Sequence, residues 1–290
     1  MSRRKLLMGK KIERVMKIGN LFSRSKLLGL LIFVSFTRIA SAQNDIQSLV
    51  EQLKKYDDPQ KQYEVGFKTS AKILGSSPLV SNQKLTQYLN LVGKTLIKNS
   101  PGDSYAWTFA AIESDDINAF AAPGGFVFVT KGLLRSLSTE DELAAVLAHE
   151  ISHVRLSHYI KVVKKQMMAE YTLKSLNENP DAQLEALASA ATLVLSRGLD
   201  KQAEFDADRE SVVLLAKSGY DPSAMADVLN MLDKKASDTN QSMSFLLTTH
   251  PHPKQRLQAL GACCADAFSE ASVKNLKTQK RFDSVIKSSL

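Results

Sequence analysis

The residues best suited to chemistry in this sequence are two histidines and a glutamate in the run His149-Glu150-Ile151-Ser152-His153. Residues four apart lie on one face of a helix, so His149 and His153 can direct ring nitrogens at a single metal ion. Glu150 can reach a water molecule held by that ion and act as its general base. The pattern predicts a zinc site that hydrolyses peptide bonds, with metal-bound water as the nucleophile.

A carboxylate on a later helix is the expected third ligand. One class of zinc protease has a histidine ten residues after the first and a glycine at seven, but this chain has Tyr159 and Leu156 there, which excludes that class. Glu204 and Asp208 are four apart, so Glu204 can complete a His₂Glu site while Asp208 holds a ligating histidine. By spacing alone, Glu204 competes for the ligand role with Asp200, Asp206 and Glu210.

The other three histidines carry weaker signals. A helix continuing past His158 would turn it about 180° away from His149, which gives His158 a structural or supporting role. His250 and His252 lie in the run Thr249-His250-Pro251-His252-Pro253. A histidine there can donate a hydrogen bond to the oxyanion of a tetrahedral intermediate, or it can occupy the open metal position and keep the site latent. The alternative is a surface turn with two exposed imidazoles.

Helices and one small sheet are expected to position these residues. Thr139–Glu142 is a capping box that starts the metal-binding helix, and its apolar stripe runs over Leu143–Val154. Alternation in Trp107–Ala111 and the β-branched and aromatic run Phe126–Thr130 predict two strands with a turn between them. Further helices are predicted within 45–100, with a turn at 75–78, and over 182–196, 204–216 and from 222 onward.

The positive charge of the chain is concentrated at its N-terminus. The whole sequence has 38 basic and 30 acidic residues, and residues 1–42 hold ten of the bases and one acid, which leaves 28 bases against 29 acids. This balance gives no support for nucleic-acid binding. A basic stretch, a short apolar core over 27–36 and the run Ala40-Ser41-Ala42 predict a secretory signal cleaved after Ala42, with an uncleaved anchor as the alternative.

The two cysteines, Cys263 and Cys264, are adjacent in sequence. Neighbouring cysteines rarely reach unstrained disulfide geometry, so a bond between them is not expected. They are predicted to be small buried residues in a helix, with an intermolecular bond or a reactive thiol as the alternatives. The tail over 274–290 is polar and basic, and it is predicted to be a solvated helix or a frayed end.

Several blocks over about 45–260 together resemble the zinc endopeptidases of the CaaX prenyl-protease type, which include HtpX-like, mitochondrial quality-control and periplasmic BepA-like proteases. The most specific blocks are the run from Asn118 to Gly125 and the metal helix. The matching residues are Gly66, Tyr88–Gly93, Asn118–Gly125, Glu142–Glu150, Glu204–Asp208, Gly219–Pro222, Thr249–Pro251 and Arg256.

The resemblance implies a fold and a set of roles. The fold is α+β and mostly α, a gluzincin domain with HExxH and ExxxD motifs and a small edge-exposed β-sheet packed on the active-site helix. One Zn²⁺ per chain would be bound by His149, His153 and Glu204, with Glu150 as the base. The remaining implied roles are Asp208 steadying a ligand, Arg256 supporting the site, His250 acting at the substrate carbonyl or as a removable fourth ligand, and Asn118, Ala119, Phe120 and Ala121 forming the edge strand that binds substrate.

The expected protein is an exported, periplasmic zinc metalloendopeptidase that hydrolyses unfolded or misassembled envelope proteins. Residues 1–42 would be the signal peptide, 43–262 the protease domain and 263–290 a helical and basic tail. The segment 182–196 is too short to span a membrane and would form a core helix or a lid. The rival hypothesis is a chaperone or assembly factor for membrane proteins with latent or secondary proteolysis, associated peripherally with those proteins.

Overall fold

The computed structural model describes residues 43–44, 46–98, 100, 104–171, 179–237, 249–250, 253–265 and 276–290. Its contacts divide the chain into two units, residues 1–53 and residues 54–290. The described part of the first unit is helical over 46–53, and all elements below belong to the second unit. The predicted leader over 1–42 lies outside the described residues. Within the described ranges, every helix is too short or too polar to cross a bilayer.

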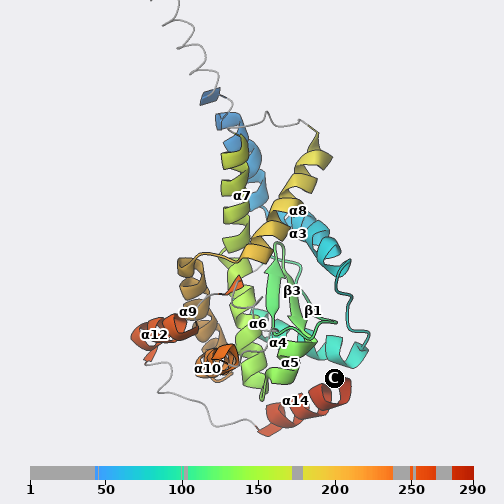
Figure 1. Ribbon diagram of the computed structural model, residues 1–290, viewed down its shortest axis with the longest axis vertical. Coiled ribbons are helices and arrows are strands. Elements are labelled where there is room, and N and C mark those ends of the chain that lie inside the picture. The colour runs from blue at the N-terminus through green and yellow to red at the C-terminus, as the bar shows by residue number, and fades with distance from the viewer. Residues whose placement is uncertain are drawn as a thin grey trace, which may run out of the picture. The chain divides into compact units, whose positions relative to one another are not determined.

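The second unit is mainly helical and contains one three-stranded sheet, which confirms the predicted fold class (Figure 1). In chain order its elements are η1 (Lys55–Asp57), α3 (Pro59–Leu74), α4 (Gln83–Lys98), β1 (Thr108–Ile112), β2 (Ala119–Ala122), β3 (Phe126–Thr130), α5 (Lys131–Ser136), α6 (Glu140–Arg155), α7 (His158–Tyr171), α8 (Pro180–Arg197), α9 (Lys201–Ser218), α10 (Ala224–Ser237), α12 (Pro253–Cys263) and α14 (Leu276–Ser289).

The sheet has the strand order β1-β3-β2, with β1 parallel and β2 antiparallel to β3. Two glycines make the tight turn between β2 and β3 possible, because Gly124 and Gly125 have φ values of 80° and 99°. Alternation of residue types predicted β1, the β-branched and aromatic run predicted β3, and β2 lies where the family resemblance implied an edge strand. Its residues are at most 8% exposed, so the edge is covered rather than exposed as expected.

Helix α6 is the central helix of the second unit, and it contacts both the sheet and several other helices. The Thr139 side chain accepts a hydrogen bond from the Glu142 amide, and the Glu142 carboxylate accepts one from the Ser138 amide, as the capping box predicted. One side of the helix contacts β2 and β3, and the other contacts α9 and α10 (Figure 1). Every residue of the helix from Leu143 to Val154 is buried.

The end of α6 differs from the prediction. The helix was expected to run past His158, but it stops at Arg155, and Ser157 adopts a φ of 56° before α7 begins at His158. A left-handed residue redirects the chain, so the angle computed for a continuous helix does not apply. His158 therefore returns toward the metal-binding face instead of pointing away from it.

The C-terminal tail is also more ordered than expected. Helix α14 contacts α4 and α6, and it buries Phe282, Val285 and Ile286 on one face. Arg281 pairs with the fully buried Glu140 at the start of α6, through Nε at 2.8 Å and through a second, shorter contact of Nη2. The amphipathic spacing of these apolar residues explains why the helix packs although its overall composition is polar and basic.

Candidate metal centre

Four potential metal ligands lie together in the structure, and the packing of α6 against α9 brings three of them to one place. His149 and His153 are one turn apart on α6, and their Nε2 atoms are 3.0 Å apart. Glu204 on α9 faces both histidines at 3.5 and 3.4 Å. His250 joins them, with Nδ1 3.0 Å from a Glu204 oxygen. One ligand atom from each of the four residues lies within 4.8 Å of the others, and all four side chains are buried.

This donor set fits a zinc ion. Ligand atoms about 2 Å from a tetrahedral ion are about 3.3 Å apart, which matches the spacings of 3.0 to 3.5 Å among these nitrogen and oxygen atoms. Glu204 Oε1 is buried and has no hydrogen-bond donor among the described residues. A buried carboxylate oxygen of this kind needs a positive partner, and imidazole with carboxylate is a ligand set typical of zinc.

Asp208 and Arg256 contact His149, the first candidate ligand, from outside the cluster. Asp208 Oδ1 lies 2.9 Å from His149 Nδ1, so it can fix the ring that would bind metal through Nε2. Arg256 on α12 donates to both Asp208 oxygens, at 2.7 and 2.5 Å, and lies 3.3 Å from Glu204. Arg256 is 3% exposed, so this pair is a buried, two-bond ion pair.

His158 makes the corresponding contact with the second ligand. Its Nδ1 lies 2.9 Å from His153 Nδ1, so one ring must carry the proton that the other accepts. If His153 binds metal through Nε2, its Nδ1 carries that proton and donates it to His158. The positive φ at Ser157 creates this contact, which explains why helix periodicity alone did not predict it.

The electrostatics of the cluster follow from burial and charge. Burial lowers the pKa of His153 to about 3, which keeps the ring neutral as a metal ligand requires. Burial and Arg256 also act to lower the pKa of His149, but hydrogen bonds to Asp208 and Glu204 outweigh them and raise it to about 9. Burial would raise the pKa of Glu204, yet His250 and Arg256 hold it well below its usual value.

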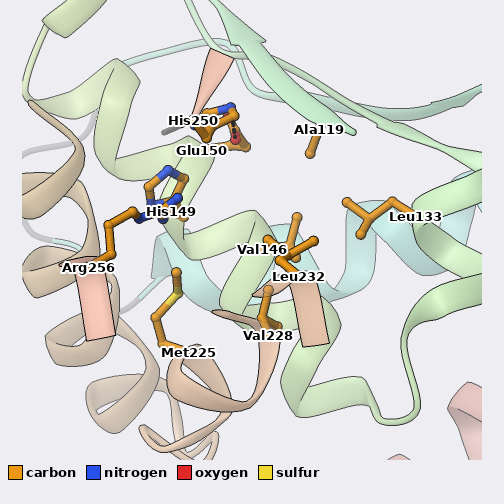
Figure 2. Close-up of a pocket in the computed structure, with 10 residues that line it drawn as sticks. All are labelled: Ala119, Leu133, Val146, His149, Glu150, Met225, Val228, Leu232, His250 and Arg256. Carbon is orange, nitrogen blue, oxygen red and sulfur yellow. Dashed lines mark hydrogen bonds and ion pairs between the residues drawn. The ribbon is translucent and has the colours of Figure 1, made fainter. Parts of the chain in front are cut away.

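Glu150 faces a small pocket beside the ligands (Figure 2). Its Oε1 is 3.8 Å from His250 Nε2, and its Oε2 is buried with no hydrogen-bond partner among the described residues. Burial raises the pKa of Glu150, which brings a carboxylate closer to the range where a general base works at neutral pH. The pocket has a volume of about 30 Å³ and an apolar wall formed by Ala119, Leu133, Val146, Met225, Val228 and Leu232.

The predicted substrate-binding strand divides between two environments. Ala119 lines the pocket beside Glu150 (Figure 2). Asn118 and Phe120 instead line a larger cavity of about 300 Å³. Ala121 is fully buried, and its backbone is hydrogen-bonded to Tyr159 on α7. The structure therefore brings Ala119 to the metal centre and directs its neighbours elsewhere.

Comparison with known proteins identifies the family. Residues 83–263, more than half of the chain, match the model of peptidase family M48. The chain belongs to peptidase family M48. The match includes β2, the α6 motif, Glu204 and Asp208 of α9, and Arg256, which are the parts of the structure that form the candidate metal centre.

Three relatives illustrate the similarity of this M48 chain to known proteins. It is 35% identical over 193 residues to the beta-barrel assembly-enhancing protease of Escherichia coli K12 and 36% identical over 194 residues to that of Yersinia pestis, covering 63% of this chain and 39% of each relative. It is 28% identical over 190 residues to the mitochondrial metalloendopeptidase OMA1 of Schizosaccharomyces pombe, covering 64% of this chain and 55% of the relative. The chain thus matches about two fifths of the length of the bacterial relatives.

Several residues around the M48 centre were not predicted from the sequence. Met225, Val228 and Leu232 on α10 line the pocket, and their helical spacing is a signal that could have indicated a shared apolar face. Tyr159 has no sequence signal, because its place beside β2 depends on the turn at Ser157. The predicted core-helix role of 182–196 agrees with α8, which packs on α3 and α7 and borders the larger cavity rather than the metal pocket.

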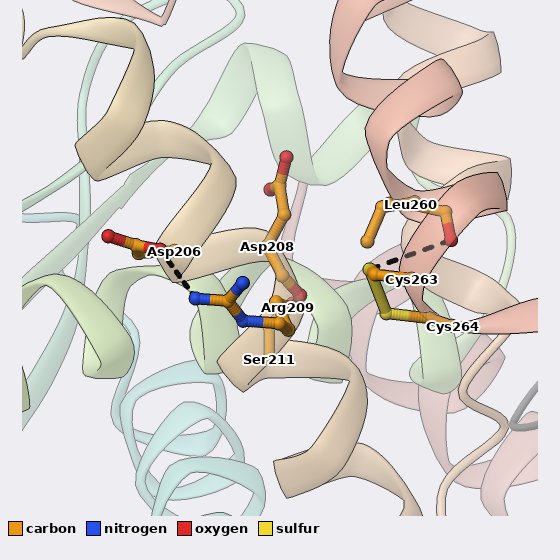
Figure 3. The surroundings of a disulfide bond; sticks show 7 residues. All are labelled: Asp206, Asp208, Arg209, Ser211, Leu260, Cys263 and Cys264. Atoms are coloured by element: carbon orange, nitrogen blue, oxygen red, sulfur yellow. Dashed lines mark hydrogen bonds and ion pairs between the residues drawn. A yellow bond between two sulfur atoms is a disulfide. The ribbon is translucent and has the colours of Figure 1, made fainter.

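The two cysteines differ from the prediction as well. Cys263 and Cys264 are joined by a disulfide at the end of α12 (Figure 3). The bond lies beside the α9 segment that carries Asp208, and Cys263 also contacts the Leu260 carbonyl oxygen at 3.7 Å. The expectation of two unbonded helical cysteines was therefore wrong: the two sulfur atoms are bonded to each other where α12 ends at Cys263.

Proposed function

We propose that this chain is an exported zinc-dependent metalloendopeptidase. The observation that carries the proposal is the buried cluster of His149, His153, Glu204 and His250, with Glu150 at its edge. One Glu150 oxygen, Oε2, is buried there without a hydrogen-bond partner among the described residues. Membership of peptidase family M48 supports the same activity. A bound zinc ion supplies Lewis acidity and makes a water molecule easier to deprotonate at neutral pH.

The residues of the chain divide the remaining work. His149, His153 and Glu204 would hold the ion. Glu150 accepts the proton of the attacking water and later gives it to the departing amine nitrogen, which is the task of a general base with a raised pKa. Asp208 keeps the His149 ring in the orientation that directs Nε2 at the ion.

His250 has two proposed roles that the geometry relates to each other. Its Nδ1 is 3.0 Å from Glu204, within the ligand cluster, so it can hold the fourth position and keep the site latent. Its Nε2 faces Glu150 at 3.8 Å, so a small displacement would leave it able to donate a hydrogen bond to a carbonyl oxygen that gains charge. We assign His250 the first role in this closed structure and the second after substrate has entered.

The proposed substrates are unfolded or misassembled envelope proteins, bound as extended chains along β2. Two relatives are named as beta-barrel assembly-enhancing proteases, and this chain matches them over the metal centre. Residues 1–42 would act as a signal peptide cleaved after Ala42, with a retained anchor as the alternative. Residues 43–262 would form the protease domain, and residues 263–290 would form the helical tail.

The second candidate function is a chaperone or assembly factor with latent proteolysis. The position of His250 among the candidate ligands favours it, because a histidine in the fourth position would keep proteolysis latent. Both functions use the same residues and differ in whether Glu150 is needed.

Metal content tests the proposal before activity does. The purified full chain is expected to bind one zinc per molecule, measured by atomic emission, and His153→Ala and Glu204→Ala are expected to lose it. Glu150→Gln is expected to retain zinc and fold but not to cleave an unfolded protein such as casein. Full cleavage by Glu150→Gln would refute the mechanism, and zinc retained at full occupancy by Glu204→Ala would show that another acid is the ligand.

A further inference from the structure

Helix α4 presents a row of lysines to solvent. Lys84, Leu91 and Lys98 follow one another at intervals of seven residues, so they lie along one line of the helix, and Lys94 is one turn before Lys98. All four residues are exposed, Leu91 to 46%. The other side of the helix is buried in the protein. The row is therefore a solvent-facing surface on a helix that is held firmly in place.

Acidic residues do not balance this row in the described part of the chain. Helix α4 contains no aspartate or glutamate, and none of the acids that the structure describes pairs with Lys94 or Lys98. The Lys84 ammonium donates to the Ser284 carbonyl oxygen of α14 at 3.3 Å, so α14 lies beside the start of α4. Lys280, one turn before Ser284, is exposed as well. We call these four lysines the basic face: Lys84, Lys94, Lys98 and Lys280.

The charge of the basic face is local. From residue 43 onward the chain has 28 basic and 29 acidic residues, so this part of the chain is nearly neutral. Asp283, the acid nearest to Lys280 in sequence, pairs with Lys287 at 3.4 Å. A cluster of one sign on a nearly neutral protein attracts an anionic partner to one side only. The basic face is thus suited to hold a negatively charged surface in one orientation.

Strand β1 places aromatic residues next to the basic face. The Ala111 carbonyl accepts a hydrogen bond from the Val80 amide ahead of α4, and the Phe109 carbonyl accepts one from the Asn90 side chain within it. Strand β1 therefore runs antiparallel to α4, and the Phe109 ring lies against Gly93. Residues before Phe109 lie toward the C-terminal end of α4, where the basic face has two of its lysines.

Trp107 and Tyr105 are the aromatic residues at that end. The Trp107 ring stacks on Phe109 with 6.0 Å between ring centroids, and the Tyr105 ring meets Trp107 edge-on at 5.7 Å. Both Trp107 and Tyr105 are half-buried. Tryptophan and tyrosine are enriched where a membrane meets water, because each has an apolar ring and a polar tip. The exposed Leu91 adds a further apolar group between the lysines.

We propose that the basic face docks the protein on an anionic membrane surface. The lysines lie against lipid phosphates, while Leu91, Trp107 and Tyr105 enter the headgroup layer, as the apolar side of an interfacial helix does. These apolar groups favour a bilayer over a nucleic acid, whose non-specific binding is supplied by charge alone.

The docking goes beyond the proposed function and depends on neither zinc nor cleavage. The residues that line the pocket beside Glu150 come from β2, α5, α6, α10 and α12, together with His250. Docking through α4 and α14 therefore covers none of them. A protein held on a membrane in this way would keep its metal centre accessible to protein substrates.

Co-sedimentation with lipid vesicles tests the docking. The full chain is expected to bind mixed vesicles of phosphatidylglycerol and phosphatidylcholine more tightly than vesicles of phosphatidylcholine alone, and salt should reduce the difference. Lys94→Gln with Lys98→Gln removes two charges, each worth about fivefold in binding near an anionic surface, so the affinity should fall about 25-fold. The matched control is Lys161→Gln with Lys165→Gln, which removes two exposed lysines with the same spacing from α7 and should bind like the wild type.

Residues 1–42 are themselves basic, so all variants are compared in the same state of leader processing, checked by intact mass. Wild-type binding by the α4 pair, an equal loss in the α7 pair, or equal binding to charged and neutral vesicles would overturn the proposal. Leu91→Gln should weaken binding to the anionic vesicles about fivefold, and an unchanged affinity would refute insertion into a bilayer. Loss of polyglutamate binding by the α4 pair with vesicle binding intact would assign the basic face to an acidic protein instead.

Zinc content and casein cleavage separate this proposal from the proposed function. The α4 pair lies outside the lining of the metal pocket, so it should keep wild-type zinc content and cleave casein in solution at the wild-type rate. A chain that docks on vesicles but does not cleave would refute the protease and support the docking. A chain that cleaves casein but does not dock would refute the docking alone.

Discussion

The buried pair of Arg256 and Asp208 gives the most quantitative prediction. Arg256→Met removes two charge-assisted hydrogen bonds of 2.7 and 2.5 Å to Asp208, and it takes the guanidinium charge away from Asp208 and Glu204, each 1% exposed. Breaking a buried ion pair from one side costs about 3–5 kcal/mol. We expect the free energy of unfolding of the metal-free protein to fall by that amount, measured by urea denaturation at neutral pH.

A double variant measures how strongly Arg256 and Asp208 stabilise each other, apart from their interactions with other residues. Asp208→Leu alone leaves the Arg256 charge buried, whereas Arg256→Met with Asp208→Leu removes both charges together. The double variant is therefore expected to lose at least about 2 kcal/mol less than the sum of the single variants. Arg155→Met is the matched control, because Arg155 pairs with Glu210 at 2.6 Å between α6 and α9 but is half-buried, and it should cost about 1 kcal/mol or less.

The pH dependence gives an independent check on the same pair. Burial acts to raise the pKa of Asp208, but Arg256 holds it below its usual value. A lowered folded-state pKa contributes stability above the unfolded pKa of about 4, and this contribution is lost as the pH falls through the folded-state pKa. The difference between wild type and Arg256→Met should therefore shrink in acid. Additive single variants, or a gap that does not depend on pH, would refute the assignment of a coupled pair.

Three further predictions concern the elements around the centre. His158→Ala is expected to weaken zinc affinity by about 10–100-fold in a chelator competition, and His158→Asn, which keeps an acceptor, should recover part of the loss. Arg281→Leu leaves the Glu140 carboxylate buried with two tyrosine hydroxyls, at 2.9 and 3.2 Å, as its remaining side-chain partners among the described residues, and should lower the unfolding free energy by about 1–3 kcal/mol in urea titrations. Tyr159→Phe removes the hydrogen bond between the Tyr159 side chain and the Ala121 backbone of β2, so casein cleavage should be faster at unchanged zinc content. Slower cleavage would contradict a covering role for Tyr159.

Much of this fold could be predicted from the sequence, because the signals for helix starts, helical faces and strands each depend on a few neighbouring residues. The capping box at Thr139 predicted the start of α6, alternation of residue types predicted β1, and a β-branched and aromatic run predicted β3. The four-residue spacings predicted that each pair of side chains, one on α6 and one on α9, shares one face of its own helix. This prediction needs no tertiary information. What spacing left open was which acid on α9 faces the histidines, because that depends on how the two helices pack.

The features that were missed depend on contacts between distant segments. Arg281 meets Glu140 across 141 positions of sequence, and no local pattern indicates that α14 docks there. The covered edge of β2 depends on how the surrounding helices pack, whereas the family resemblance implied an exposed edge. A single backbone angle at Ser157 accounts for the wrong orientation predicted for His158, because side-chain periodicity assumes an unbroken helix.

The turn at Ser157 also connects the candidate metal centre with β2, the strand proposed to bind substrate. It places His158 against His153 at 2.9 Å, and it places the next residue, Tyr159, against the outer edge of β2. Any movement of the start of α7 that frees the strand for substrate must also disturb the contact that orients a metal ligand. Substrate entry and the geometry of the metal centre would therefore change together, whereas Tyr159→Phe frees the strand without moving His158. Comparing zinc affinity in Tyr159→Phe and in a Ser157→Pro variant, which cannot keep the positive φ, would separate the two effects.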